Sequence, residues 1–427
     1  MPLTAVERLL LSYDTPARPM TIRVRLQWDR PVDADLLRRA AVAATPRHPL
    51  LTATTDGREW STPGVPPPIN FVESNDADGG SPGVSSRPHA ERLRGSRRPR
   101  SARLPKVSGG DAPGVAVTHR GDVTDLDFHH ACCDGQGGRQ WGTDFFLTAD
   151  AFARGVQPDL PRLDNSLLET RGDLSHPAGV EPITGGEGLR NLRLTTRGRT
   201  ARLRGEEPGE RLWERTYSPE ETASLRKRLA AAGLTMNDAG LVATFRALAE
   251  TPGLTGGRVT VLNPVDLRKP SDLRMPAANK LGFAYLRRTR AEIAGDIAAS
   301  VVDQMRYVKD RFAGAEFVRG LELVQDVPGV LRALRLLGKF VPTAQFTCLG
   351  DSTRGRRHGL RRDGGAVLVG EARLLSISGF APLSPGVPLS LAACETANRL
   401  SLTARSALPQ AATEDFAGRW ADHLFGV

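Results

Sequence analysis

One short stretch of the chain combines residue types that could carry out acid–base chemistry: Asp127-Phe128-His129-His130-Ala131-Cys132-Cys133-Asp134-Gly135. The pattern leading into it predicts a strand over residues 123–130, with successive side chains on opposite faces. His130 then shares an apolar face with Phe128, whereas His129 shares the other face with Asp127. Because burial disfavours the charged form, the pKa of a buried imidazole falls and the ring is neutral near pH 7. His130 is therefore a candidate general base.

Other chemistry at this stretch is less well supported. Adjacent strand residues point to opposite faces, so His129 and His130 could hardly bind one ion together, and we expect no metal site. Cys132 and Cys133 are interpreted as small packing residues rather than nucleophiles, and a purely structural role for both histidines stays open. The sequence contains no GxSxG, P-loop or GxGxxG pattern, which argues against a serine hydrolase, a P-loop NTPase and a dinucleotide enzyme.

Strand and helix patterns occur in both halves of the chain and must position this stretch. Residues 21–28 alternate as a half-buried strand, and Asp33 can cap a helix with one apolar stripe. Ser218 begins a capping box, and Asn237 can cap the helix that follows. Further segments have strand patterns (115–118, 258–263, 374–378, 389–393, 400–404) or helix patterns (291–311, 413–424). The mixture predicts an α/β or α+β protein with two lobes.

Composition limits the class of protein. The chain has 427 residues, 40% of them hydrophobic and 25% charged, which is enough for a packed core. No apolar run approaches the ~18 residues of a membrane-spanning helix, and the first residues do not resemble a signal peptide. The four cysteines show no CxxC spacing, which argues against a disulfide scaffold. We expect a cytoplasmic, soluble protein that does not contact a membrane.

The net charge of +10 is concentrated in two segments. Residues 85–106 carry eight basic residues and one acidic residue, and residues 354–362 carry five arginines and no acid. Neither segment interleaves aromatic residues or accompanies a known nucleic-acid-binding motif, so we expect no nucleic-acid partner. A solvated loop, or a docking site for an acidic partner or a phosphate, remains open for each segment.

The stretch from His129 to Gly135 resembles the HHxxxDG motif of the condensation-domain and chloramphenicol-acetyltransferase superfamily. Other stretches support this resemblance in family order: Arg47-His48-Pro49-Leu50-Leu51, Thr235-Met236-Asn237-Asp238, Asn263-Pro264-Val265-Asp266-Leu267-Arg268, Asn279 with Gly282, and Phe346 to Gly350. The resemblance covers nearly the whole chain. It implies two acetyltransferase-like lobes in a V with a tunnel between them, which we place at residues 1–175 and 176–427.

The resemblance also implies roles for the motif residues. His130 would take a proton from the attacking amine or hydroxyl group, or position that group and stabilise the tetrahedral intermediate. Asp134 would be structural through an ion pair with Arg268, and bidentate arginine is the best partner for a buried carboxylate. Gly135 would let backbone and substrate approach closely, and His129 would be structural.

The implied activity is that of a stand-alone acyltransferase in nonribosomal-peptide or polyketide-type natural-product biosynthesis. The enzyme would join an acyl thioester to an amine or alcohol, with no permanently bound cofactor. Phosphopantetheine of an acyl or peptidyl carrier protein, or coenzyme A, would carry the acyl group. We expect a monomer with two further sets of site residues, in the tunnel (Cys133, Asn279, Cys348) and at the donor-docking surface (Arg354, Arg356, Arg357).

The chain departs from the family pattern at three places. Gly137 stands where many relatives have serine, Phe283 stands where NxxGN ends in asparagine, and residues 73–110 are basic and rich in Gly and Pro. Two other functions remain possible: a non-catalytic protein that binds or recruits a carrier-bound intermediate, and a cyclisation or isomerisation catalyst in the same tunnel.

Overall fold

The computed structural model describes most of the chain as strands, helices and ordered loops: residues 1–16, 18–63, 68–73, 114–177, 179–181, 183, 200–205, 210–327, 329, 342–351 and 359–426. Within these residues, one sheet has seven strands in the order β11 (Arg362–Asp363), β12 (Ala366–Val369), β13 (Ala372–Phe380), β1 (Thr21–Trp28), β6 (Val123–His129), β5 (Val115–Arg120) and β4 (Asn70–Glu73). All neighbouring pairs in this sheet are antiparallel except β4 with β5.

A second sheet is formed mostly by the later part of the chain. Its six strands among the described residues follow the order β7 (Arg211–Thr216), β15 (Arg399–Ser406), β14 (Leu389–Thr396), β10 (Ala344–Asp351), β8 (Val259–Asp266) and β9 (Leu281–Arg288). β10 is parallel to both of its neighbours, whereas the other pairs are antiparallel. A small hairpin joins β2 (Thr54–Thr55) to β3 (Trp60–Ser61). The mixed α/β class predicted from the sequence is confirmed.

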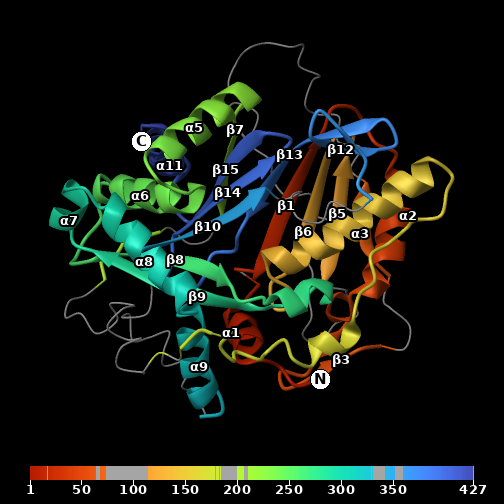
Figure 1. Ribbon diagram of the computed structural model, residues 1–427, viewed down its shortest axis with the longest axis horizontal. Helices are drawn as coiled ribbons and strands as arrows, with labels where there is room; N and C mark the ends of the chain where they lie inside the picture. Colours follow the sequence, from red (N-terminus) through yellow and green to blue (C-terminus); the bar gives the residue numbers. More distant parts are fainter. Residues whose placement is uncertain are drawn as a thin grey trace.

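Helices cover the sheets on separate sides of the molecule (Figure 1). α2 (Ala34–Ala44) and α3 (Gly135–Ala153) pack together over the first sheet. The second sheet carries α5 (Pro219–Ala231), α6 (Met236–Ala249) and α11 (Gln410–Phe425), while α7 (Arg290–Ala294) contacts α6, and α8 (Ala298–Asp310) contacts α6 and β9. α1 (Ala5–Tyr13) contacts α9 (Gly314–Val324), which also packs on β9. Short 3₁₀ turns complete the described part at Thr45–Arg47, Pro49–Leu51, Asn165–Leu168 and Pro270–Arg274.

Local capping explains where several helices begin. The side chains of Asp33 and Ser218 cap α2 and α5 as the sequence predicts, and Ser218 closes the expected capping box with Glu221. Asn237 was the wrong residue for the cap of α6, because the Thr235 side chain accepts the hydrogen bond from Asp238 N–H and places Asn237 inside the helix. The single helix predicted over 291–311 is divided between α7 and α8, because α7 ends at Gly295.

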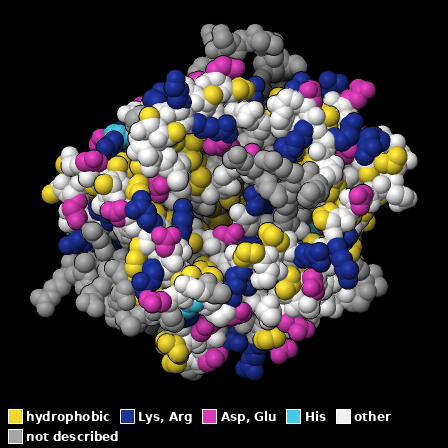
Figure 2. All heavy atoms as spheres, viewed as in Figure 1, with side chains coloured by type: hydrophobic (Ala, Val, Ile, Leu, Met, Phe, Trp, Pro, Cys, Tyr) yellow, Lys and Arg dark blue, Asp and Glu magenta, His cyan; other side chains and the backbone are white. Residues whose placement is uncertain are grey.

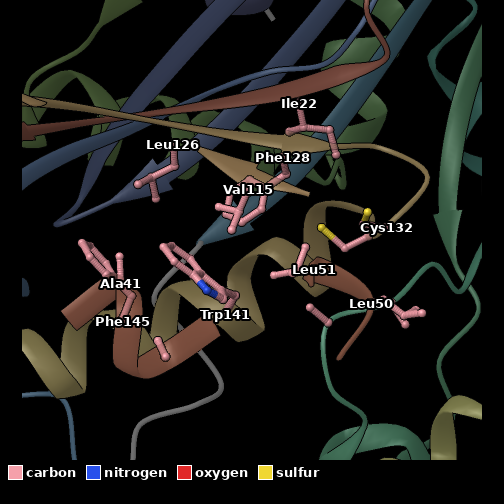
Figure 3. Close-up of a cluster of buried hydrophobic side chains, with 14 of the residues drawn as sticks. Ile22, Ala41, Leu50, Leu51, Val115, Leu126, Phe128, Cys132, Trp141 and Phe145 are labelled. Carbon is pink, nitrogen blue, oxygen red and sulfur yellow. The ribbon is translucent and has the colours of Figure 1, made fainter. Parts of the chain in front are cut away.

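The core under α2 and α3 holds β6, the strand that leads into His130, in place (Figure 3). Trp141 of α3 stands edge-on to Phe128 of β6 with ring centroids 5.4 Å apart, and stacks on Phe145 at 5.0 Å. Cys132 is fully buried beside Leu51 in the same cluster, as Figure 3 shows. Burying such large rings stabilises the fold by several kcal/mol and fixes β6 against α3.

The two sheets do not divide at residues 175 and 176. β11, β12 and β13 come from residues 362–380 but belong to the first sheet, where β13 pairs with β1 from Arg23↔Phe380 onward. β13 also contacts β14 and β15 of the second sheet. The boundary expected from the sequence therefore leaves out a segment that crosses back, and this segment ties the two sheets together.

Candidate active site

A cavity of about 740 Å³ lies between the two sheets, within the range of ~300–1,000 Å³ typical of small-molecule sites. Its walls come from α1, β1, β6 and the start of α3 on one side, and from β8, β9, α9, β10 and β14 on the other. Most lining side chains are apolar, and His130 is among the few titratable groups. Figure 2 shows a hollow near the centre of the viewed face with hydrophobic side chains inside it.

His130 follows directly after β6 and lines this cavity. Its backbone is held from two sides, by its N–H donating to Met20 O at 2.7 Å and by Asn279 Nδ2 donating to its carbonyl at 2.8 Å. The ring nitrogen Nδ1 lies 3.2 Å from the carbonyl oxygen of Cys133. Because a carbonyl can only accept, Nδ1 carries the proton in the neutral ring, and Nε2 is left as the proton acceptor.

The protonation state of His130 suits this arrangement. The half-buried ring loses hydration of its charged form, and this desolvation lowers its pKa despite the nearby Asp134 charge. The imidazole is therefore neutral near pH 7, with one fixed tautomer. A base positioned in this way can accept a proton from a bound amine or hydroxyl group.

Asp134 caps α3 and forms the expected ion pair with Arg268. Arg268 donates from Nη1 to Oδ2 at 2.9 Å and from Nη2 to Oδ1 at 3.0 Å, and the backbone N–H groups of Gly137 and Lys280 complete the shell at 2.8 and 2.9 Å. Burial alone would raise the pKa of Asp134, but the Arg268 charge and these hydrogen bonds lower it overall. The pair joins the motif turn to the loop after β8.

Two of the three expected tunnel residues do not line the cavity. Cys133 is fully buried beneath the motif turn, and burial raises the pKa of its thiol. Asn279 is 3% exposed and donates from Nδ2 to the carbonyls of His130 and Ala131, so it holds the turn from behind. Cys348 of β10 does line the cavity, with a thiol whose pKa burial raises to about 11. Cys133 and Asn279 therefore pack behind the motif turn and do not line the cavity.

His129 lies on the side away from the cavity lining. The ring is fully buried, its Nδ1 accepts from Ala131 N–H at 3.2 Å, and its Nε2 lies 3.4 Å from the Asp14 carboxylate. These contacts tie the motif turn to the segment after α1. The contacts of the His129 side chain are therefore structural.

The sequence reasoning missed a second support of the site, built on His48. Its Nδ1 accepts from Ala277 N–H at 2.9 Å, so in the neutral ring Nε2 carries the proton and faces Asp144 at 3.3 Å. Asp144 also pairs with Arg47 at 2.7 Å. This contact holds the segment from Ala277 to Lys280 that clamps the motif turn. In the sequence, the Arg47-His48 pair was the only sign of this support. The contact between His48 and Ala277 could not be predicted, because it depends on the fold.

The proposed donor-docking residues Arg354, Arg356 and Arg357 lie outside the described residues, as does the basic segment 85–106. Arg361, at the end of the second basic segment, pairs with Asp150 of α3 with Nη2 2.9 Å from Oδ1. In the part of the chain that the structure describes, no group of three or more His, Cys, Asp or Glu side chains could hold a metal ion. No described helix is long and apolar enough to span a membrane.

Comparison with solved structures identifies the fold. The first condensation domain of the calcium-dependent antibiotic synthetase, in complex with a substrate analogue, matches with a TM-score of 0.66 and 16% identity over 99% of this chain and 96% of its own. The epimerization domain from the third module of tyrocidine synthetase B matches at 0.65 and 17% identity, over 100% and 95%. A starter condensation domain of rhizomide synthetase, a double mutant in complex with C8-CoA and Leu-SNAC, matches at 0.63 and 13%, over 100% and 93%.

No protein-family model matches the chain, and no curated protein sequence matches it. At these identities the solved structures show the fold alone. The chain has the condensation-domain fold, which confirms the fold that the resemblance implied.

Proposed function

We propose that this protein is a condensation-type acyltransferase that joins an acyl thioester to an amine or alcohol. The observation that carries the proposal is His130, a neutral imidazole of defined tautomer on the wall of an apolar cavity of about 740 Å³. The condensation-domain fold supports it, because its solved relatives are synthetase domains, one of them with C8-CoA and Leu-SNAC bound.

The reaction we propose is direct transfer within the cavity. The acceptor nitrogen or oxygen attacks the thioester carbonyl carbon while His130 Nε2 takes the acceptor proton. The tetrahedral intermediate then expels the thiolate as the C–S bond breaks, and the proton returns from His130 to the departing sulfur. Holding both substrates in one cavity makes the attack effectively unimolecular, which contributes much of the rate.

The cysteine side chains favour direct transfer over a covalent acyl-enzyme. A thiolate is the reactive form of cysteine, and burial raises the pKa of the Cys348 thiol to about 11 and that of Cys133 higher still. Both thiols therefore stay protonated near pH 7. Phosphopantetheine on a carrier protein, or coenzyme A, would supply the thioester, and Arg354, Arg356 and Arg357 remain candidates for docking it in a cytoplasmic, monomeric enzyme of natural-product biosynthesis.

The test is product formation by the full-length protein. The protein is incubated with octanoyl-CoA or an octanoylated carrier protein and a panel of amines and alcohols, and the masses of the products are measured by mass spectrometry. An acceptor that gains the octanoyl mass, with release of free thiol, supports the proposal. Thioester consumption without any acylated acceptor would contradict it.

Isomerisation of a tethered substrate is a second candidate, because one of the matching structures is an epimerization domain. A base such as His130 could remove a proton next to a thioester carbonyl as well as from an acceptor. The same assay separates the two activities, since isomerisation changes no mass but exchanges hydrogen for deuterium when it runs in D₂O. A non-catalytic recruitment protein would bind the thioester and show neither change.

A further inference from the structure

Leu349 fills a space that two glycines leave open at the cavity wall. A Cβ added to Gly135 would lie 2.8 Å from Cδ2 of Leu349, and a Cβ added to Gly379 would lie 2.8 Å from its Cδ1. Apart from chain neighbours and, for Gly135, the backbone of its own helix, no other heavy atom of the described residues comes within 4 Å of either added Cβ. The Leu349 side chain is therefore enclosed between the glycine of the HHxxxDG stretch and the end of β13.

Irregular backbone directs Leu349 into this space. The pairing of β10 with β14 runs from Cys348↔Ala393 to Gly350↔Cys394 and so skips Leu349. An extra residue of this kind interrupts the ladder and re-aims its side chain. Gly350 follows with a φ of +61°, in the left-handed region that glycine adopts at no cost.

Leu349 also lies close to the chemistry. It lines the same cavity as His130, and the glycine it touches is the first residue of α3, at the end of the motif turn. Another edge of the cavity is formed by α9, where Leu323 is 85% exposed. In Figure 1 the C-terminal end of β10 lies beside β13, whereas α9 extends away from the sheets. Leu349 thus borders the part of the cavity wall that is formed by the motif turn and the end of β13.

We infer that Leu349 is a size gate that determines the width of the acyl group presented to His130. The inference rests on the proposed function, because it assigns a specificity residue to the same cavity. The two methyl groups of Leu349 occupy the space between Gly135 and Gly379, so shortening this side chain widens the cavity there. A methyl group added at either glycine pushes Leu349 into the cavity and narrows it.

The test is equilibrium binding of two pantetheine thioesters, octanoyl (narrow) and 2-naphthoyl (wide), to the full-length protein without acceptor. Leu349→Ala is expected to shift the ratio of the two affinities toward the naphthoyl thioester by about tenfold, the scale on which small changes of apolar pockets discriminate ligands. Gly379→Ala is expected to shift the ratio in the opposite direction. Leu273→Ala, a leucine 68% exposed and outside the cavity lining, is the matched control and should leave the ratio unchanged.

The double variant Gly379→Ala/Leu349→Ala makes the test specific. Among the described residues, chain neighbours apart, only Leu349 lies within 4 Å of the new methyl group. The effect of Gly379→Ala is therefore expected to disappear in the Leu349→Ala background. A ratio that stays within twofold in Leu349→Ala, a Gly379→Ala effect that persists in the double variant, or no binding of either thioester overturns the size gate. Thioester binding with these shifts, but without any acyl transfer, supports the gate and contradicts the proposed function separately.

Discussion

His130 combines three properties that a general base needs: access to a cavity, a neutral ring and a defined acceptor nitrogen. Each has its own physical cause, namely the end of β6 at the cavity wall, desolvation, and the Cys133 carbonyl that takes the Nδ1 proton. His129, its neighbour in the sequence, does not line the cavity, because consecutive side chains leave a strand in opposite directions.

Replacing His130 by alanine is expected to lower kcat for acyl transfer by about 10²–10⁴-fold, the usual contribution of general acid–base catalysis. The fold should persist, because the backbone contacts to Met20 and Asn279 do not use the ring. Steady-state kinetics checks the rate, and thermal melting checks the fold. Full activity in a folded His130→Ala protein would remove the role assigned to this side chain.

The lowered pKa of His130 gives the reaction a defined pH dependence. Protonation of Nε2 removes the base, so kcat/KM is expected to fall as pH decreases through a value below the ordinary histidine pKa of 6.5. Measuring kcat/KM from about pH 5 to 8 checks this acidic limb of the pH dependence. The acceptor should be an alcohol, because an amine would itself change protonation state over the pH range. The residual activity of His130→Gln is the control and should lack the limb; a limb centred above 6.5 would contradict the assignment.

The start of α3 depends on contacts from the other half of the chain. Asp134 caps this helix, Arg268 neutralises the cap, and Asn279 and Lys280 hold the turn before it. A charged carboxylate this well buried is stable only while its partners remain. The element that carries the motif is therefore fixed by the loop after β8 and the segment before β9.

Arg268→Ala should lower the free energy of unfolding by about 3–5 kcal/mol, because it leaves the buried Asp134 carboxylate without its ion pair. Asp134→Ala should lower it by less, because Arg268 keeps its ion pair with Asp266 at 3.1 Å. The double variant should lose less than the sum of the two. The pKa of Asp134 lies below its unfolded value of 3.8, so its contribution is complete above that pH and is lost as pH falls through the folded value. Denaturant melts of the four proteins check this, and additive losses would argue against the pair.

Gly137 illustrates how closely α3 approaches the same loop. A Cβ at this position would lie 2.7 Å from Ala278 O and 2.9 Å from Ala278 N, and backbone cannot move aside cheaply. Gly137→Ala is expected to destabilise the protein by about 1–3 kcal/mol through overpacking. Gly418→Ala in α11, where an added Cβ meets nothing within 4 Å, is the matched control and should be stabilising by about 0.4–1 kcal/mol. Equal melting temperatures for the two variants would contradict the close approach.

The molecule as a whole is tied together by chain segments that cross between the sheets. β13 supplies a strand of the first sheet from the second half of the chain, and it sits beside β1. Arg25 of β1 reaches Glu214 of β7 at 3.3 Å, and the buried Arg405 of β15 donates to Thr21 O at 2.8 Å. The cavity walls keep their spacing because these contacts hold both sheets in one arrangement.

Residues 1–175 alone are expected not to fold, since they lack β13, and without it the backbone hydrogen-bonding groups along one edge of β1 lose their partner strand. Circular dichroism and limited proteolysis of this fragment check the expectation. Co-expression with residues 176–427 is the control and should yield a complex that purifies as one species. A fragment 1–175 that melts cooperatively by itself would show that β13 is dispensable.

Local patterns were enough to predict the strand–turn register around His130 and the caps at Asp33 and Ser218, because each depends on residue types and short spacings. The pair of Asp134 with Arg268 was expected only because the chain resembles condensation domains, since 134 positions separate the two residues. Helix α3 was not predicted, since Gly135, Gly137 and Gly138 are poor helix formers. The helix begins where Asp134 accepts from Gly137 N–H while Arg268 and Lys280 hold the same carboxylate. The single helix predicted over residues 291–311 is likewise interrupted at Gly295, between α7 and α8.

The amino-acid order alone indicated His130 as the candidate base, and the resemblance of its short motifs to condensation domains implied the Asp134–Arg268 pair and the class of fold. Tertiary structure alone assigns β13 to the first sheet, removes Cys133 and Asn279 from the cavity wall, and brings Leu349 against Gly135 and Gly379. The physical reason is that each of these facts is a contact between segments distant in the chain, and such contacts are selected by packing of the whole core rather than by any local preference.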